Sequence, residues 1–258
     1  MLCDSHIHIG QFYKEYFSPQ WLMNKMAALG IDCAMVSSTT TCEENYDRVL
    51  AEMQALSQIG RDSVFPVLWV TPLMMQDHKV IHRFLHCGIK WYCVKIHGAL
   101  HEGWFTTYSV AMKSAVKIAQ KLGVPLLMHT GGRECCEAGY YEKIVSLHKR
   151  QTFILAHGRP VEQTIEVMLK HQNAWCDTAF APTGDIVRLI NAGLADRILW
   201  GTDLPIPSHF YGADMDYKSY YNTLLKQLQK EITRDDYTKI TQDNFFRVFH
   251  NRYISQPS

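Results

Sequence analysis

The chain has 258 residues and a mass of 29.8 kDa, which suits one barrel-type domain of roughly 250 residues. Hydrophobic residues make up 47% and charged residues 20%, and this ordinary globular composition excludes collagen-like, disordered and disulfide-stapled miniature proteins. The 26 Lys and Arg balance 25 Asp and Glu, so a net charge of +1 gives no electrostatic reason to expect nucleic acid or an anionic membrane as partner.

The sequence also predicts the compartment. The first residues form neither the basic segment nor the apolar segment of a signal peptide, and no uncharged apolar stretch approaches the roughly 18 residues of a membrane span. The eight cysteines form no Cys-x-x-Cys pair and read mostly as buried thiols. We therefore expect a soluble, cytoplasmic protein with a small-molecule partner, and a homo-oligomer remains open.

Short apolar runs alternate with longer segments of helical spacing along the whole chain. In chain order, we predict strand 1–9, helix 19–29, strand 33–37, helix 43–58, strand 64–70, helix 78–86, strand 91–97, helix 108–122, strand 124–129, helix 141–149, strand 152–157, helix 161–171, strand 174–177, helix 183–192 and strand 197–203, with one or two more helices after residue 216. Pro19 suits a first helical turn, and Gly123 suits a helix end.

Eight strand-then-helix units are the number that a closed parallel barrel requires. The nearly continuous apolar run 124–128 suits a sheet buried on both faces, and no linker or change of composition marks a second domain. We therefore predict an α/β fold, a single-domain (β/α)8 TIM barrel over residues 1–258, closed by the C-terminal helices from about residue 216. An open doubly wound sheet would give a similar alternation and stays an alternative.

Five predicted strands end in side chains that can bind a metal or carry a proton. In a parallel barrel these strand ends meet at the C-terminal face, where active sites lie. Two residues separated by one position project to the same side of a strand, so a His-x-His sequence can hold one ion. The residues are His6 and His8, Lys95 and His97, His129, His157 and Asp203. Their repeated placement at strand ends predicts a metal site.

The same residues resemble a known family. Asp-Ser-His-Ile-His at 4–8, His-Thr-Gly from 129, His-Gly from 157 and Gly-Thr-Asp-Leu-Pro at 201–205 are similar to motifs of the amidohydrolase superfamily, specifically its amidohydrolase-2 (amidohydrolase-related) branch. The resemblance runs from residue 3 to about residue 250 and includes the closing helix at 244–249. It is specific for the superfamily but not for the substrate, because the branch contains both hydrolases and non-oxidative decarboxylases.

The resemblance implies a ligand set and roles for the residues. His6, His8, His129 and Asp203 would hold one divalent ion, and three imidazoles with one carboxylate suit zinc, with manganese or iron possible. Asp203 would accept the proton of the attacking water and pass it to the leaving group. His157 would orient the water or stabilise developing negative charge.

Lys95 has two interpretations. In two-metal relatives the corresponding lysine is carbamylated and bridges both ions, which would add a second ion here. Lys95 and His97 are closer to the Lys-x-His pattern of single-metal relatives, in which the lysine stays cationic, and both would then bind substrate. Arg133 and Arg159 follow two of the site histidines, and an arginine fork matches a carboxylate, so we expect an anionic substrate.

Four functions follow, in order of preference. The first is a metal-dependent hydrolase that cleaves an amide, lactone or ester of a small acid, and the second is a metal-dependent decarboxylase of an aromatic or enoic acid. The third is a non-catalytic metabolite-binding barrel that retains an ion. The fourth is a two-ion enzyme of the phosphotriesterase or nuclease type.

Overall fold

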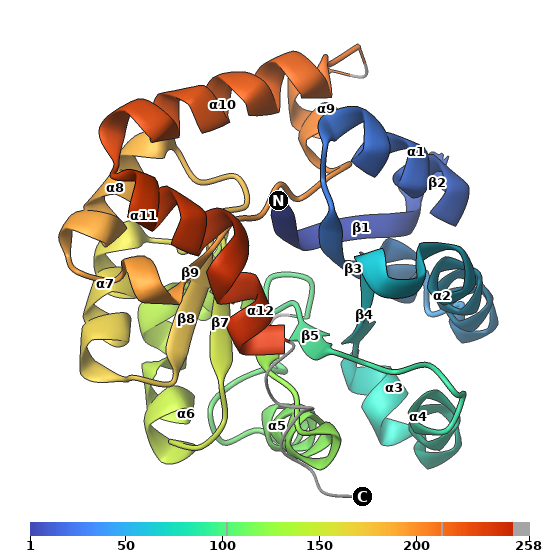
Figure 1. Cartoon of the computed structure of the whole chain (residues 1–258). Helices are drawn as coiled ribbons and strands as arrows, with labels where there is room; N and C mark the ends of the chain where they lie inside the picture. The colour runs from blue at the N-terminus through green and yellow to red at the C-terminus, as the bar shows by residue number, and fades with distance from the viewer. Residues whose placement is uncertain (102, 213, 250–258) are drawn as a thin grey trace, which may run out of the picture.

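The computed structural model describes residues 1–101, 103–212 and 214–249, so the expected domain end at residue 258 lies outside the described residues. Its strands form one sheet in the order β2-β1-β3-β4-β5-β6-β7-β8-β9 (Figure 1). β2 pairs antiparallel with β1, and the other neighbours pair parallel. The strands are β1 (Cys3–Phe12), β2 (Glu15–Phe17), β3 (Cys33–Ser38), β4 (Val64–Trp69), β5 (Cys93–Ile96), β6 (Leu126–His129), β7 (Phe153–Ala156), β8 (Ala174–Asp177) and β9 (Ile198–Leu199).

The sheet closes between β1 and the segment that follows β9. Ile7 pairs parallel with Leu204, the His8 amide donates to Leu204 O at 2.7 Å, and the Asp203 amide donates to His6 O at 2.8 Å. A doubly wound sheet reverses its strand order beside the first strand and stays open, whereas here the parallel strands follow in sequential order and these bonds join the last to the first, which excludes it. Within the described chain, β1 and β3 to β9 are the eight parallel strands of a single-domain (β/α)8 barrel, and β2 extends β1 into a hairpin outside it.

Helices follow the strands and cover the outside of the barrel (Figure 1). They are α1 (Pro19–Leu29), α2 (Tyr46–Gly60), α3 (Pro72–Gln76), α4 (His78–Leu85), α5 (Val110–Leu122), α6 (Glu142–Leu147), α7 (Val161–Lys170), α8 (Thr183–Asn191), α9 (Pro207–Tyr211), α10 (Tyr217–Glu231), α11 (Arg234–Thr238) and α12 (Asn244–Phe249). The end signals of α1 explain why its bounds match the prediction: Ser18 caps the first turn, and Gly30 ends the helix at φ 70°. None of the described helices is long and apolar enough to cross a membrane.

Several predicted elements differ from the structure in their bounds, among them the first strand, which runs to Phe12 instead of residue 9, and two of them differ for local reasons that the hydrogen bonds show. The predicted helix 43–58 begins later, at Tyr46, because residues 39–43 form a 3₁₀ turn and the Asn45 side chain caps α2 by accepting the Arg48 amide. The predicted strand 197–203 shortens to β9 because the Trp200 amide donates to Ile240 O and the Gly201 amide to Thr178 Oγ1, away from the β8 ladder. The short elements β2, α3 and α9 were not predicted at all.

The barrel interior is filled toward its N-terminal end. Alternate side chains of the strands form this interior core together with residues of α12, and they are Cys3, Cys33, Met35, Phe65, Val67, Cys93, Leu127, Ile154, Ala156, Trp175, Leu199, Phe245, Val248 and Phe249. The Phe245 ring lies 5.1 Å from the ring of Phe65. In Figure 1, α12 lies near the centre of the strands that it covers. With this end packed, the C-terminal end is the one left for a site.

Candidate active site at the C-terminal end of the barrel

The strand faces that carry the interior core also carry polar side chains at the C-terminal end of the barrel. Side chains two positions apart share a face, so the next interior residue along a strand stands one layer higher. Above Val67, Cys93, Leu127 and Trp175 this layer holds, respectively, Trp69, Lys95, His129 and Asp177. The sequence therefore fixes which side chains reach the site once the core face is known.

A cavity of about 750 Å³ opens above this layer. Its polar lining includes His8, Lys95, His97, His129, His157, Arg159 and Asp203, together with Gln11, Thr39 and Glu43. Its apolar lining is mainly aromatic, with Phe12, Tyr13, Trp69, Phe180, Phe210 and Tyr211 beside Leu100 and Ile206. A pocket with apolar walls and converging polar groups is suited to binding a small molecule with one acidic end.

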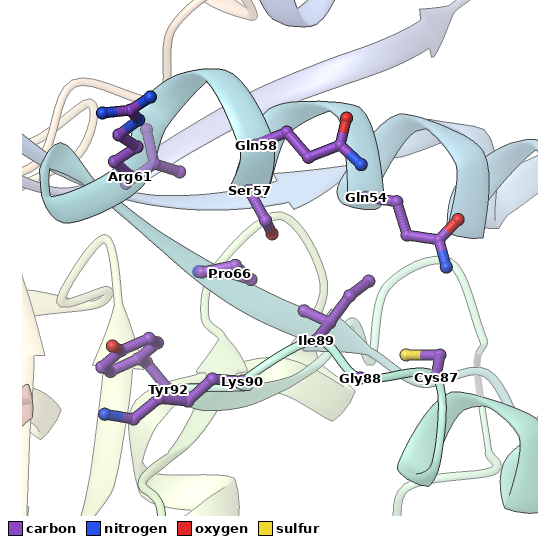
Figure 2. Close-up of a pocket in the computed structure, with 11 residues that line it drawn as sticks. Gln54, Ser57, Gln58, Arg61, Pro66, Cys87, Gly88, Ile89, Lys90 and Tyr92 are labelled. Carbon is purple, nitrogen blue, oxygen red and sulfur yellow. The ribbon is translucent and has the colours of Figure 1, made fainter.

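A second cavity, of about 540 Å³, lies near the N-terminal ends of β4 and β5. Figure 2 shows side chains of α2, including Gln54 and Gln58, on one side of it and residues 87–90 with Tyr92 on the other. Its described lining contains amides, one arginine and one lysine, but no histidine or carboxylate. The histidines and carboxylates that can perform acid–base or metal chemistry therefore gather at the first cavity.

Three ligand atoms converge in the first cavity. Asp203 Oδ1 lies 3.0 Å from His8 Nε2 and 3.4 Å from His6 Nε2. Two ligand atoms that each lie about 2.0–2.1 Å from a tetrahedral Zn²⁺ are roughly 3.3 Å apart. The observed spacing therefore fits a shared divalent ion, and all three side chains are buried.

The other ring nitrogens of both histidines are held by hydrogen bonds. His6 Nδ1 lies 2.9 Å from Asp177 Oδ2, and His8 Nδ1 lies 2.9 Å from Ser37 Oγ. A carboxylate can only accept, so His6 carries its proton on Nδ1 and keeps its lone pair on Nε2, facing Asp203. Histidines that bind metals usually have such a partner, which fixes the ring orientation.

Asp177 was not predicted to belong to the site. Its Oδ1 accepts the amides of His157 at 2.8 Å and Ala179 at 3.0 Å, while its Oδ2 faces His6. One buried carboxylate thus aligns His6 and holds the backbone of His157, which has a φ of 69°. The available signal was its position at the end of the predicted strand 174–177, the same criterion that selected the other residues.

Burial sets the protonation of these groups. Desolvation, reinforced by the Lys95 ammonium, lowers the pKa of His6 and of His8 well below the usual value. Desolvation raises the pKa of Asp203, which His6 and Lys95 partly oppose. The imidazoles are therefore neutral near pH 7, as metal coordination requires, and the carboxylate is more basic than an exposed aspartate.

Lys95 lies among these groups rather than at the rim. Its Nζ is 2.8 Å from His6 Nε2 and 3.2 Å from His8 Nε2, and it lies 4.5 Å from the centre of the Trp69 ring. Desolvation lowers the pKa of Lys95 to about 8, although Asp203 and Asp177 favour its charged form.

His129 and His157 form a separate chain of hydrogen bonds. His157 Nδ1 lies 2.9 Å from the carbonyl of Ala179, so Nδ1 donates and Nε2 is left as an acceptor. His129 Nδ1 lies 3.1 Å from His157 Nε2 and must therefore donate, which leaves the lone pair of His129 on Nε2. His129 also stacks on His97 at 3.7 Å. The structure thus joins His129 directly to His157, and the convergent group of His6, His8 and Asp203 does not include it.

The expected substrate-binding residues separate into two groups. His97 and Arg159 line the cavity, and the Arg159 guanidinium donates to Phe180 O at 2.9 Å. Arg133 is exposed and does not line it, because Gly131 and Gly132, both at positive φ, turn the chain past the rim. The structure therefore brings Arg159, but not Arg133, to the site.

A buried carboxylate behind β3 supports the rim of the cavity. Glu52 accepts the hydroxyls of Ser38 at 2.6 Å and Thr40 at 3.0 Å, and its ion pair with Arg48 measures 3.1 Å. Gly10 lies against this network at φ 95°, where a Cβ would come within 2.5 Å of Thr40 Oγ1. The glycine that follows His-Ile-His-Ile therefore lets β1 pass close to the network.

Comparison with known proteins shows the family of the chain. The family model described as amidohydrolase matches residues 3–250, nearly the whole chain. The chain belongs to the amidohydrolase family. The match includes every histidine and carboxylate of the site described above. Among curated proteins, no significant sequence match is found.

Solved structures of similar fold include members with different reactions. An uncharacterised TIM-barrel protein from Bordetella bronchiseptica is 18% identical with a TM-score of 0.70, covering 96% of this chain and 97% of its own. A probable 2-pyrone-4,6-dicarboxylic acid hydrolase from Acinetobacter baumannii, with citric acid bound, is 10% identical with a TM-score of 0.68, covering 96% and 98%. The 5-carboxyvanillate decarboxylase of Sphingomonas paucimobilis is 11% identical with a TM-score of 0.67, covering 96% and 98%. At these identities the likeness of this amidohydrolase to them shows the fold.

Proposed function

We propose that the protein is a metal-dependent hydrolase that cleaves an amide, lactone or ester bond of a small substrate carrying a carboxylate. The observation that carries this proposal is the donor set of His6, His8 and Asp203, spaced 3.0–3.4 Å about Asp203 Oδ1. We propose one ion, with zinc the first choice and manganese or iron as alternatives. The eight described cysteines are all unpaired, which supports our proposal of a cytoplasmic location.

We assign the fourth ligand to His129, whose ring would have to move toward the convergent group of His6, His8 and Asp203, because it lies outside that group in the structure. Its Nδ1 proton is used toward His157, so Nε2 is the nitrogen with a lone pair to offer. A bound divalent ion would supply Lewis acidity, polarising a substrate carbonyl and acidifying water. Asp203 faces His6 and His8 through Oδ1, so its second oxygen is left to take up the proton of that water and return it to the leaving group.

The remaining cavity residues would bind and orient the substrate. Arg159 supplies a planar cation beside the aromatic wall, which suits a carboxylate on a planar or apolar body. His157 would orient the attacking water, for which its Nε2 would have to exchange the bond with His129 for one with the water while Ala179 keeps its Nδ1 in place. His97 would contact the substrate from the ring stack with His129.

A decarboxylase of an aromatic or enoic acid is the second candidate. The aromatic wall favours it, and a decarboxylase stands among the proteins of similar fold. A panel of amides, lactones, esters and aromatic acids separates the two reactions. Acid or amine release without carbon dioxide supports the hydrolase, whereas carbon dioxide release supports the decarboxylase, and ligand binding without turnover in metal-replete protein contradicts both.

Metal analysis tests the site directly. Protein purified without chelators should contain about one equivalent of divalent metal, and a double variant with His6→Ala and His8→Ala should lose metal and turnover together. His78→Ala, on the exposed start of α4, is the matched control and should change neither. His157→Asn should keep the metal and slow turnover. Unchanged stoichiometry in the double variant contradicts the ligand assignment, and two equivalents in the parent favour carbamylated Lys95.

A further inference from the structure

The ammonium group of Lys95 contacts the same two histidine nitrogens, Nε2 of His6 and Nε2 of His8, that the proposed metal site needs. The side chain is 2% exposed, and its Nζ makes contacts of 2.8 Å and 3.2 Å with the Nε2 atoms of His6 and His8. Around it, the charged carboxylates are Asp203 on one side and Asp177 behind His6. A single cation of the chain itself therefore occupies the centre of the polar layer.

The lone pair of His6 decides how the contact can be made. A neutral imidazole has one N–H and one ring lone pair, and Asp177 requires the N–H on Nδ1. The lone pair on Nε2 then accepts from Lys95 Nζ. The same lone pair cannot also coordinate a metal ion, so one contact must be broken for the other to form.

We propose that Lys95 and the metal ion compete for His6 Nε2, so that Lys95 holds the donors together in the metal-free protein and withdraws when metal binds. This inference rests on the proposed function, because it assumes the same donor set. An ammonium group and a dication a few ångströms apart also repel each other strongly in a buried site, which adds to the competition.

The cavity gives the withdrawn ammonium group a place to go. Lys95 and His97 both line it, and the Trp69 face, already 4.5 Å from Nζ, can hold the cation during the movement. Four methylene groups allow Nζ to move while the strand stays fixed. In its new position the ammonium group would face the cavity and could pair with a substrate carboxylate, alongside Arg159.

The test compares metal affinity in whole-length variants. Zn²⁺ and Co²⁺ affinities are measured at pH 7 by competition with a chromogenic chelator and by calorimetry, without any substrate. Lys95→Met removes the competitor and should bind metal at least about tenfold more tightly than the parent protein. Lys95→Arg keeps a permanent cation and should bind no more tightly than the parent. Lys117→Met, on the exposed face of α5, should leave affinity unchanged.

Each outcome has a distinct meaning. Equal affinity in the parent protein and folded Lys95→Met overturns the competition while leaving the proposed metal site intact. Weaker binding by Lys95→Met overturns it too, and shows that Lys95 contributes to binding, as a carbamylated lysine would. If Lys95→Met does not fold, tighter binding by Lys95→Arg overturns the proposal. If neither the parent protein nor Lys95→Met binds metal, both the proposed metal site and the competition are refuted.

Discussion

Replacing Asp177 with asparagine should move a proton on His6. The two oxygens of Asp177 have different partners: Oδ1 accepts two backbone amides, and Oδ2 accepts His6 Nδ1. In Asp177→Asn the amide oxygen can keep both backbone bonds, so the NH2 group must face His6. Because NH2 is a donor, His6 Nδ1 would then have to accept, and its proton would move to Nε2.

This change removes the lone pair that the proposed metal site needs. We expect metal affinity to fall by about 10- to 100-fold, or about 1.4–2.7 kcal/mol, the usual effect of removing the group that orients a metal-binding histidine. The folded state should lose about 1–3 kcal/mol, because the buried amides stay bonded but His6 Nε2 no longer accepts from Lys95 Nζ. In Asp177→Ala both amides lose their acceptor, and stability should fall by about 1–3 kcal/mol for each.

Calorimetric metal titration and urea unfolding measure the two effects separately. Ser37→Ala serves as the contrast, because it removes the partner of His8 Nδ1 without presenting a new donor, so its affinity should drop less than that of Asp177→Asn. A folded Asp177→Asn protein that binds metal as tightly as the parent would show that the tautomer of His6 does not control binding.

Three further changes test the rim and the substrate pocket. Gly10→Ala should lower the free energy of unfolding in urea by at least about 2 kcal/mol, because a Cβ has no room there. Gly30→Ala, also at positive φ but in open space, should lower it by about 1 kcal/mol. Equal losses in the two variants would contradict the argument. Glu52→Gln should lower the free energy of unfolding by about 1–3 kcal/mol, since two buried hydroxyls and the half-exposed Arg48 depend on the carboxylate. Unchanged stability would refute this role. Arg159→Met should raise KM for a carboxylate substrate about tenfold or more, while Arg133→Met should change KM little. A larger effect of Arg133→Met would contradict the placement of the two arginines.

The barrel could be predicted from sequence because its signals are local and repeated. Each parallel strand is a short apolar run, and the helices begin and end with residues such as Ser18 and Gly30. Closure could not be predicted from periodicity, since it depends on the bonds of Leu204 and Asp203 to β1, which join residues almost 200 positions apart. The hairpin strand β2 has only three residues and no pattern of its own.

The sequence predicted which types of residue form the site, but it did not predict the hydrogen bonds between them. The ends of strands brought His6, His8 and Asp203 together, but the same rule did not lead us to Asp177. The link between His129 and His157 depends on the carbonyl of Ala179, a backbone group that no side-chain pattern reveals. Likewise, the distance of 2.8 Å from Lys95 to His6 follows from how two strands are set against each other in the closed barrel.

The layered interior separates the side chains of the site from the apolar packing beneath them. Cys93 and Lys95 occupy the same face of β5 one pleat apart, and the lower layer rests on Phe245 and its neighbours in α12. A substitution in the upper layer therefore leaves the contacts of the lower one in place. Laboratory evolution of this protein could exchange the upper residues for new reactions without first rebuilding the packing that keeps the barrel closed.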